Sequence, residues 1–322
     1  MNDPKPIQSS NSLLHPFSDP LITAKGDQRA HVGLQKLETL WFNTGTLCNI
    51  ECVNCYIESS PKNDRLVYLT FGDVSGYLDE IESEGLGTTE IGFTGGEPFM
   101  NPDMGAILEH TLERGFDALM LTNAMHPMLR PAVRAQVEKL VSKFGDKLTF
   151  RVSLDHHTAR LHDEERGPGA FNKAMEGLAF LSHIGASLNI AGRTCWDEEE
   201  AAARAGYSQL FLKNDIHVDP NDGAALILFP EMDDKADVPE ITVDCWSLLN
   251  VDPATMMCAT SRMVVKHKGA DAPTVAACTL LPYDEGFDMG ATLKEASRAV
   301  ALNHRHCAKF CVLGGGSCSA AT

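Results

Sequence analysis

Residues 46–56 read Thr46-Leu47-Cys48-Asn49-Ile50-Glu51-Cys52-Val53-Asn54-Cys55-Tyr56, and they follow an apolar run at residues 37–43 that is typical of a β-strand. The three cysteines have the spacing C-x3-C-x2-C. Three thiolates on one short loop can bind one face of a metal cluster, and soft thiolate ligands select iron–sulfur clusters or zinc. Four ligands close such a site, whereas three leave one position open for a substrate or cofactor. A zinc knuckle is the alternative, but no His or Cys follows at the distance of a zinc ribbon.

Strand-like and helix-like patterns alternate along the chain on both sides of this loop. Such alternation implies parallel strands joined by helical crossovers, in an open sheet or a barrel. In both arrangements the chemistry gathers at the carboxyl ends of the strands. The expected strands are residues 37–43, 89–94, 118–122, 147–154, 186–191 and 224–229, and the expected helices are residues 71–84 (with Thr70 as its cap), 101–114, 131–144, 170–184 and 196–205.

A second motif follows the strand expected at residues 89–94, which ends in Gly95-Gly96-Glu97-Pro98. Together with the cysteine triad, the aromatic Tyr56 and the order of strands, this motif resembles the radical S-adenosylmethionine (radical SAM) superfamily, in which a GGEP motif occupies the same place. The resemblance covers about residues 37–230. It implies an α/β fold, a partial (β/α)6 TIM-like barrel, with the radical SAM core at residues 36–235.

The resemblance also implies cofactors and a reaction. Cys48, Cys52 and Cys55 would hold three irons of a [4Fe-4S] cluster, and S-adenosylmethionine (SAM) would chelate the fourth iron. Reduction, by an electron donor such as flavodoxin or ferredoxin, would cleave SAM to methionine and a 5′-deoxyadenosyl radical, which removes a hydrogen atom from the substrate. The cofactors supply the difficult chemistry, and the protein orients them and excludes water.

Several residues beside the two motifs are candidates for binding SAM. Gly95 and Gly96 lack a Cβ, so their backbone can approach the methionine moiety, although a tight turn alone would also explain them. Glu97 offers a carboxylate to the ammonium group of SAM. Tyr56 is placed to lie against the adenine.

Polar residues at later strand ends are further candidates. The resemblance implies that the ends of the fourth and fifth strands reach the ribose and the carboxylate of SAM, whereas strand-end capping is the alternative role. The candidates are Ser153, Arg193, Asn123, Asp155 and Asn189. His156 and His157 follow the fourth strand and are suited to proton transfer, but adjacent histidines on a polar loop are more often simply solvated.

The alternation of strand-like and helix-like patterns ends after residue 235. The remaining chain contains an expected hairpin at residues 263–280 with Gly269 as its turn, an expected short helix at residues 292–302, and several cysteines. It resembles the SPASM/twitch extensions of radical SAM enzymes, which implies a small Cys-rich α+β domain at residues 236–322 with one auxiliary [4Fe-4S] cluster. A structural zinc site with the same ligands is the alternative. The expected ligands are Cys258, Cys278, Cys307 and Cys311, with Cys318 as the substitute.

The composition excludes several classes of protein. The chain has 322 residues, and 43% of them are hydrophobic, which is enough for a sizeable core. Its net charge of −17 argues against a nucleic-acid or membrane-surface partner. No apolar run is long enough to span a bilayer and no secretion signal is evident, so we expect a cytoplasmic protein with a loosely ordered leader at residues 1–35. In the cytoplasm the cysteines are expected to be reduced thiols. Cys195 and Cys245 are interpreted as core residues.

Three functions are compatible with these patterns. The first is a radical SAM enzyme that acts on a small molecule or a short peptide. The second is a maturase that oxidises or cross-links a ribosomally made peptide. The third is a non-catalytic protein that binds a cluster or zinc, and the intact cysteine triad and Glu97 argue against it. Peptide maturases often carry an N-terminal peptide-recognition domain, and residues 1–35 are too short for one, which favours the first function.

Overall fold

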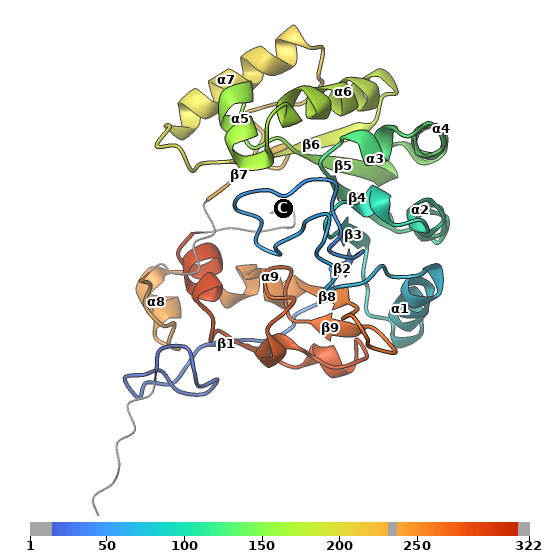
Figure 1. The fold of residues 1–322 in the computed structure, drawn as a ribbon. Helices are drawn as coiled ribbons and strands as arrows, with labels where there is room; N and C mark the ends of the chain where they lie inside the picture. The colour runs from blue at the N-terminus through green and yellow to red at the C-terminus, as the bar shows by residue number, and fades with distance from the viewer. Residues whose placement is uncertain (1–14, 231–236, 315–322) are drawn as a thin grey trace, which may run out of the picture.

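The computed structural model describes residues 15–230 and 237–314, and an eight-stranded curved sheet forms the centre of this part of the chain (Figure 1). The strand order is β7-β6-β5-β4-β3-β2-β8-β9. Neighbouring strands run parallel except β8 and β9. Six parallel strands in chain order, β2 to β7, confirm the expected partial (β/α)6 barrel. The strands are β2 (Thr39–Asn43), β3 (Glu90–Thr94), β4 (Asp117–Thr122), β5 (Leu148–Ser153), β6 (Ser187–Arg193), β7 (Leu226–Phe229), β8 (Ser261–Val265) and β9 (Thr274–Ala276).

The helices that connect β2 to β7 lie on the outer face of the sheet (Figure 1), except for α5, which lies at the strand ends, where its Arg166 pairs with Asp155. The first begins where the sequence predicts, because Thr70 and Asp73 form a capping box in which each side chain accepts a hydrogen bond from the other's backbone N–H. The helices are α1 (Phe71–Glu84), α2 (Met104–Glu113), α3 (His126–Leu129), α4 (Pro131–Phe144), α5 (Ala159–Arg166), α6 (Ala170–His183) and α7 (Glu200–Lys213), followed by α8 (Cys245–Leu249) and α9 (Met257–Thr260).

Two helices begin later than their sequence patterns predict. Asn101 accepts a hydrogen bond from the Asp103 N–H (2.9 Å) and donates one to the Leu69 carbonyl (2.8 Å), so it closes a turn before α2. Asp197 has a φ of 50°, a left-handed conformation that an α-helix excludes, so α7 begins only at Glu200.

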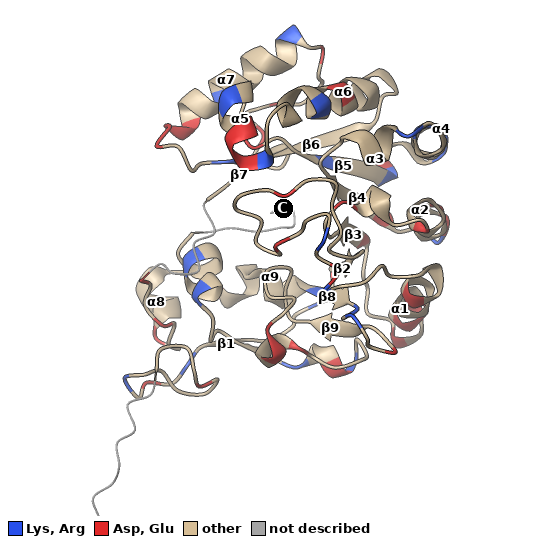
Figure 2. Ribbon diagram, viewed as in Figure 1, with Lys and Arg blue, Asp and Glu red and all other residues tan. Residues whose placement is uncertain are grey.

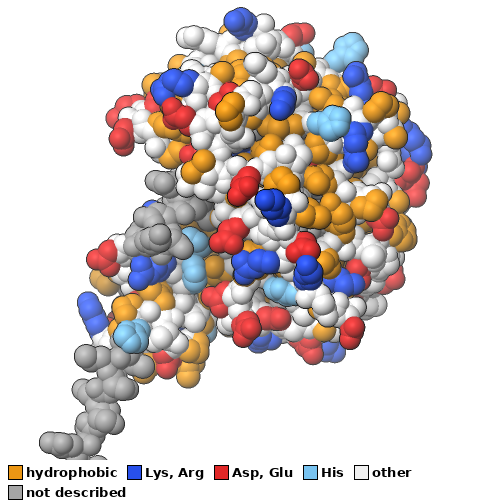
Figure 3. Space-filling view, viewed as in Figure 1, with side chains coloured by type: hydrophobic (Ala, Val, Ile, Leu, Met, Phe, Trp, Pro, Cys, Tyr) orange, Lys and Arg blue, Asp and Glu red, His pale blue; other side chains and the backbone are white. Residues whose placement is uncertain are grey.

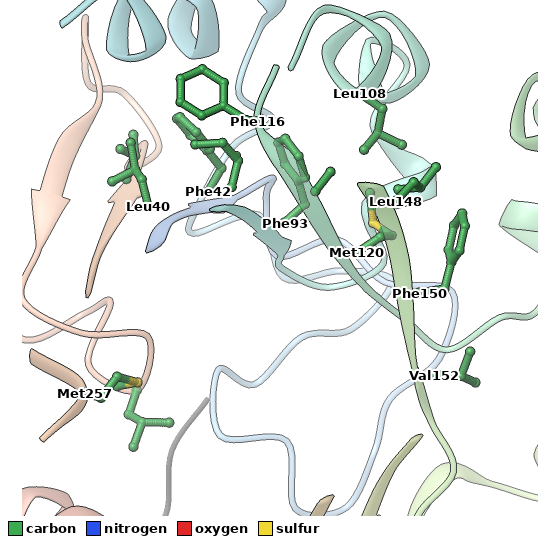
Figure 4. Close-up of a cluster of buried hydrophobic side chains, with 14 of the residues drawn as sticks. Leu40, Phe42, Phe93, Leu108, Phe116, Met120, Leu148, Phe150, Val152 and Met257 are labelled. Carbon is green, nitrogen blue, oxygen red and sulfur yellow. The ribbon is translucent and has the colours of Figure 1, made fainter. Parts of the chain in front are cut away.

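The main hydrophobic core lies between the outer face of the sheet and the helices (Figure 4). Side chains alternate between the two faces of a strand, so every second residue of the central strands enters this core. Each of these large side chains contributes about 2–3 kcal/mol through burial, and together they fix the position of the strand ends. The central members are Leu40, Phe42, Phe93, Met120, Phe150 and Val152, all 0% exposed.

A second, smaller cluster fills the inner face of the sheet. It contains Trp41, Leu119, Met263 and Val265. Gly92 faces this cluster, and a Cβ there would lie 2.4 Å from the Trp41 ring, so the indole needs a glycine opposite it. These side chains fill part of the barrel interior.

The C-terminal region continues the sheet of the barrel. The predicted hairpin is confirmed, and its first strand, β8, pairs in parallel with β2. The helix expected at residues 292–302 is wrong. The chain there forms a short 3-10 turn at Glu295–Ser297 and then the strand β10 (Val300–Ala301), which pairs with β1 (His31–Val32). This segment forms a strand because it pairs with a strand some 270 residues earlier in the sequence, and local periodicity does not reveal such a partner.

Residues 15–35 are packed against the domain, which differs from the loosely ordered leader expected. The buried Arg29 forms an ion pair with Glu240 (2.5 Å) and donates hydrogen bonds to the carbonyls of Asp19, Ile22 and Leu302. Ala30 and Val32 are buried beside it. Residues 1–14 lie outside the described part of the chain.

Charged side chains of both signs are distributed over the molecule. Figure 2 shows them mainly on the outer helices and loops, and on the face in Figure 3 acidic and basic groups are interspersed. This distribution gives no extended basic surface on that face, in keeping with the net charge. None of the helices in residues 15–230 and 237–314 has the length and apolar character that crossing a bilayer requires.

Candidate active site

A cavity of about 220 Å³ opens at the carboxyl ends of the parallel strands. Its wall is built from the loop after β2 and from the ends of β3, β4, β5 and β6. Both sequence motifs therefore meet at one place, although they are about 40 residues apart in the chain. The sequence-predicted residues in this wall are Cys48, Cys52, Cys55, Tyr56, Gly95, Gly96, Asn123, Ser153, Asp155 and Arg193.

The loop that carries the first three cysteines is held at both ends. The Cys48 N–H donates to the Ser60 carbonyl (3.1 Å), and the Val53 N–H donates to the carbonyl of Glu165 in α5 (2.9 Å). The carboxylate of Glu165 also accepts from the side-chain amide of Asn54 (2.9 Å). These bonds fix the loop across the concave side of the sheet, where Figure 1 shows it as a blue segment.

Burial strongly affects the thiols of this loop. Burial raises the pKa of Cys48 to about 12 and also raises the pKa of Cys52, although the nearby Arg166 opposes the shift at Cys52. Such thiols hold their protons at neutral pH. A bound metal would displace those protons and stabilise the thiolates, and Arg166 would offset part of the negative charge.

The two glycines after β3 lie directly against the cysteine loop. A Cβ on Gly96 would lie 2.2 Å from the Leu47 carbonyl oxygen, and a Cβ on Gly95 would lie 2.5 Å from that of Gly45. Gly95 also has a φ of 144°, which favours glycine. The Gly96 N–H donates to the Gly45 carbonyl (2.7 Å). The glycines therefore serve the packing of the loop in addition to lining the cavity.

Glu97 lies behind the cavity wall and is 1% exposed. Its carboxylate accepts hydrogen bonds from the Thr122 hydroxyl (2.9 Å), the Asn123 N–H (2.9 Å) and the Phe99 N–H (3.2 Å). Burial raises its pKa to about 7, and these donors limit the shift. In this arrangement Glu97 positions the end of β4, and the Asn123 amide in turn lies 3.8 Å from the Cys48 sulfur.

Two ion pairs line the opposite side of the cavity. Arg166 binds Asp155 through two hydrogen bonds (2.6 and 2.9 Å). Burial alone would raise the pKa of Asp155, but the charge and hydrogen bonds of Arg166, together with the nearby His162 and Arg193, lower it below its usual value. Arg193 pairs with Glu165 (2.8 Å), and its buried Nη2 has no hydrogen-bond partner among the described residues. A buried donor without an acceptor is costly, so the cavity favours an anionic or carbonyl group beside Arg193.

The cavity also contains residues that the sequence analysis did not identify. Arg151 and Arg166 add positive charge to the wall, and Leu280 and Phe310 reach it from the C-terminal region. No local pattern marks these residues, because their role depends on tertiary packing. Asn189 does not line the cavity, since it lies on β6 deeper than Ala191 and Arg193.

The C-terminal cysteines meet at a second, smaller pocket. Cys258 lies in α9, Cys278 follows β9, and Cys307 and Cys311 are four residues apart in a π-helix at Cys307–Val312. All four line the pocket, and Leu280 lines both this pocket and the larger cavity. Cys318 lies outside the described residues. Burial raises the pKa of Cys258 to about 11 and raises the pKa of Cys307 well above its usual value.

A buried guanidinium lies next to these thiols. Arg262 is 1% exposed and donates hydrogen bonds to the carbonyls of Cys258, Ala296 and Arg298. Within residues 15–230 and 237–314 no carboxylate forms an ion pair with it. Negatively charged thiolates bound to a metal centre would provide the missing counter-charge.

The spacing of ligand atoms bears on the kind of metal centre. A single metal ion needs at least three ligand atoms close to one another. In the described part of the chain, such a group, with its ligand atoms within 4.8 Å of one another, is formed by His156, His157 and Glu198. No three cysteine sulfurs of the described residues form a group of this kind. A single tetrahedral zinc ion with Zn–S distances of about 2.3 Å would bring its sulfurs to about 3.8 Å. The wider spacing of both cysteine sets suits a multi-iron cluster better than one ion.

The remaining candidates lie away from both cysteine sites. His156 and His157 are not in the cavity wall. Cys245 accepts a hydrogen bond from the Thr242 N–H (3.4 Å) and is half-buried, which agrees with a structural role, and Cys195 is also half-buried outside the cavity.

Comparison with known proteins gives one family match. The profile of the Radical SAM superfamily matches residues 42–199. Among curated proteins, the subtilosin biosynthesis protein AlbA of Bacillus subtilis (strain 168) is 29% identical over 145 residues, which cover 45% of this chain and 30% of that protein. An AdoMet-dependent heme synthase of Methanosarcina barkeri is 32% identical over 135 residues, which cover 42% of this chain and 36% of that protein. The matched part thus spans about a third of the length of these relatives.

Solved structures show the same fold beyond the matched segment. SuiB of Streptococcus suis, in a crystal structure with bound S-adenosylmethionine, aligns with a TM-score of 0.58 over 80% of this chain and 64% of that chain. The sequence identity is 13%. The alignment supports the barrel architecture described above.

Proposed function

We propose that this chain, whose residues 42–199 match the Radical SAM superfamily, is a radical SAM enzyme that binds a [4Fe-4S] cluster and SAM in the cavity at the strand ends. One observation carries the proposal. The cysteine triad, the Gly95-Gly96 pair and the polar ends of β4, β5 and β6 line the same cavity. When bound and reduced, these cofactors supply a 5′-deoxyadenosyl radical that abstracts hydrogen from a substrate.

The residues of the cavity fit these groups. Cys48, Cys52 and Cys55 would hold three irons and leave the fourth without a protein ligand. The partnerless Nη2 of Arg193 would bind the SAM carboxylate, and the glycine backbone would lie against the methionine moiety. Tyr56 and Ser153, in the same wall, would contact the adenine and the ribose.

We further propose that Cys258, Cys278, Cys307 and Cys311 hold an auxiliary [4Fe-4S] cluster. Their common pocket and the buried Arg262 support a metal centre held by thiolates. Among the described residues no three of the cysteine sulfurs lie within 4.8 Å of one another, which favours a cluster over a single zinc ion. Because Leu280 lines both sites, a substrate in the larger cavity would lie close to this second centre. An auxiliary centre at that position suits a reaction in which the substrate is oxidised.

The substrate that we propose is a small molecule or a short peptide segment. The cavity of about 220 Å³ is lined mainly by apolar surface, and two of its three arginines are already paired with Asp155 and Glu165, so the lining favours a substrate whose reacting segment is largely apolar. Maturation of a ribosomally made peptide is the second candidate. The relative AlbA acts in the biosynthesis of a bacteriocin, and SuiB has been solved with its precursor peptide SuiA, which supports this candidate.

The test is anaerobic reconstitution with iron and sulfide, followed by reduction in the presence of SAM. We expect about eight irons per chain and formation of 5′-deoxyadenosine. Cys48→Ala should abolish the product, whereas Cys245→Ala is the matched control and should retain it, because Cys245 lies outside both pockets. Equal product from wild type and Cys48→Ala would refute the proposal. To separate the two substrate classes, the peptide-free and peptide fractions of a host-cell extract are tested separately for stimulation of 5′-deoxyadenosine formation.

A further inference from the structure

We propose that His156, His157 and Glu198 form a binding site for a divalent transition-metal ion, separate from both cysteine sites. One ring nitrogen of each histidine and one carboxylate oxygen of Glu198 lie within 4.8 Å of one another. The three residues come from two loops, the one after β5 and the one before α7. None of them lines the cavity or the pocket of the C-terminal cysteines.

The distances are close to those of a coordinated ion. With metal–ligand bonds of about 2.0–2.2 Å, tetrahedral ligands lie about 3.4 Å apart. His156 Nε2 is already 3.0 Å from Glu198 Oε2. The Glu198 side chain is 29% exposed, so it can rotate by the small amount needed to complete the set, and an ion can reach it from solvent.

The two imidazole rings are held in place by their surroundings. His156 is buried, and its ring packs against His157 (4.0 Å between centroids) and edge-on against Trp196 (5.1 Å). His157 packs against Tyr207 (5.7 Å), and its ring occupies the space beside Gly206, where a Cβ would lie 2.4 Å from it. Rings fixed in this way lose little entropy when they bind an ion.

The hydrogen bonds around His156 set its tautomer. Its Nδ1 accepts a hydrogen bond from the Thr158 N–H (3.0 Å), so the ring proton lies on Nε2 and is donated to Glu198 Oε2 (3.0 Å). An ion at Nε2 would displace this proton, and Nδ1 would then carry the ring proton and donate it to the Thr158 hydroxyl, 2.9 Å away, in place of the bond from the Thr158 N–H. The buried Nδ1 of His157 has no hydrogen-bond partner in the described part of the chain.

Two histidines and one glutamate are three ligands, which leaves a coordination position open for water or another small ligand. The ion would connect the two loops that begin beside Asp155 and Arg193, both in the cavity wall. The site would therefore stiffen one side of the proposed SAM cavity without contacting its contents.

The test uses Zn²⁺ as the probe and the fully iron-loaded enzyme, so that the cysteines are already occupied. Equilibrium dialysis and zinc K-edge absorption should give one zinc per chain with only nitrogen and oxygen neighbours at about 2.0–2.1 Å. Glu198→Gln and His157→Asn should weaken binding about tenfold or more. Glu199→Gln is the control, because Glu199 is exposed and makes no capping hydrogen bond. All variants should keep the iron content of the wild type, which separates loss of the site from loss of the fold.

Three results would overturn the proposal. They are the absence of bound zinc, a sulfur shell at about 2.3 Å, and zinc binding by Glu198→Gln that equals the wild type. Because iron content and 5′-deoxyadenosine formation are measured separately, failure of this site would leave the proposed radical SAM function standing.

Discussion

Gly96→Ala tests how the second motif supports the cysteine loop. The added Cβ would lie 2.2 Å from the Leu47 carbonyl oxygen and 2.8 Å from the Thr46 carbonyl oxygen. Both contacts are with backbone, so no side chain can turn aside to relieve them. The loop that leads to Cys48 must move instead.

The energetic cost follows from what that movement breaks. Overpacking of this kind costs about 1–3 kcal/mol. The shift also weakens the hydrogen bonds from the Gly96 N–H to the Gly45 carbonyl (2.7 Å) and from the Glu97 N–H to the Leu47 carbonyl (3.1 Å), each worth about 0.5–1.5 kcal/mol. We expect a loss of about 2–6 kcal/mol in the free energy of unfolding.

The assay is anaerobic urea unfolding of the reconstituted protein, together with its iron content and its SAM affinity. The variant should unfold at lower urea and bind SAM more weakly. Gly76→Ala is the control, since a Cβ there meets nothing within 4 Å and the residue lies within α1. It should be neutral or stabilising by up to about 1 kcal/mol. If Gly96→Ala matched the wild type in all three measurements, the close packing of Gly96 against the cysteine loop would contribute nothing to stability, iron binding or SAM binding, and the reasoning would be refuted.

Three further predictions concern single residues. Burial lowers the pKa of His162 from 6.5 to about 4, so the unfolded chain takes up a proton at a higher pH than the folded chain does, and the free energy of unfolding falls as the pH drops from 6.5 towards 4. Between pH 7.5 and 5.5 the free energy of unfolding, measured in urea, should therefore fall by about 1 kcal/mol more in the wild type than in His162→Asn. Equal decreases in the two proteins would contradict this prediction. Cys258→Ala should lower the iron content from about eight to about four per chain while 5′-deoxyadenosine is still formed, and an unchanged iron content would remove this residue from the auxiliary site. Arg166→Met leaves the buried Asp155 without its partner and should cost about 3–5 kcal/mol in the same unfolding assay, whereas a cost below about 1 kcal/mol would show that the pair is not important for stability.

The sequence predicted those features that depend on neighbouring residues. Thr70 and the apolar spacing after it predict α1 because capping and periodicity are local. The spacing C-x3-C-x2-C and the GGEP motif are local in the same sense, and they indicate the residues that line the cavity. The alternation of strands and helices predicts parallel strands, and the resemblance to the radical SAM superfamily then predicts the barrel order of these strands.

Features that depend on distant partners were not predictable in the same way. β10 replaces an expected helix because Val300 and Ala301 pair with Val32 and His31. The contribution of Arg166 depends on Asp155, which it meets only after α5 has folded back over the strand end. The carboxylate of Glu97, expected to bind SAM, accepts three hydrogen bonds from the protein, and nothing in its local sequence reveals those donors.

Electron paramagnetic resonance of the reduced enzyme, recorded with and without SAM, tests most directly whether one iron of the cluster at Cys48, Cys52 and Cys55 is open to the cofactor. A Cys258→Ala background removes the signal of the auxiliary centre. We predict that SAM changes the g-values of the remaining cluster signal and that Cys48→Ala abolishes the signal. A cluster spectrum that saturating SAM leaves unchanged would contradict the account.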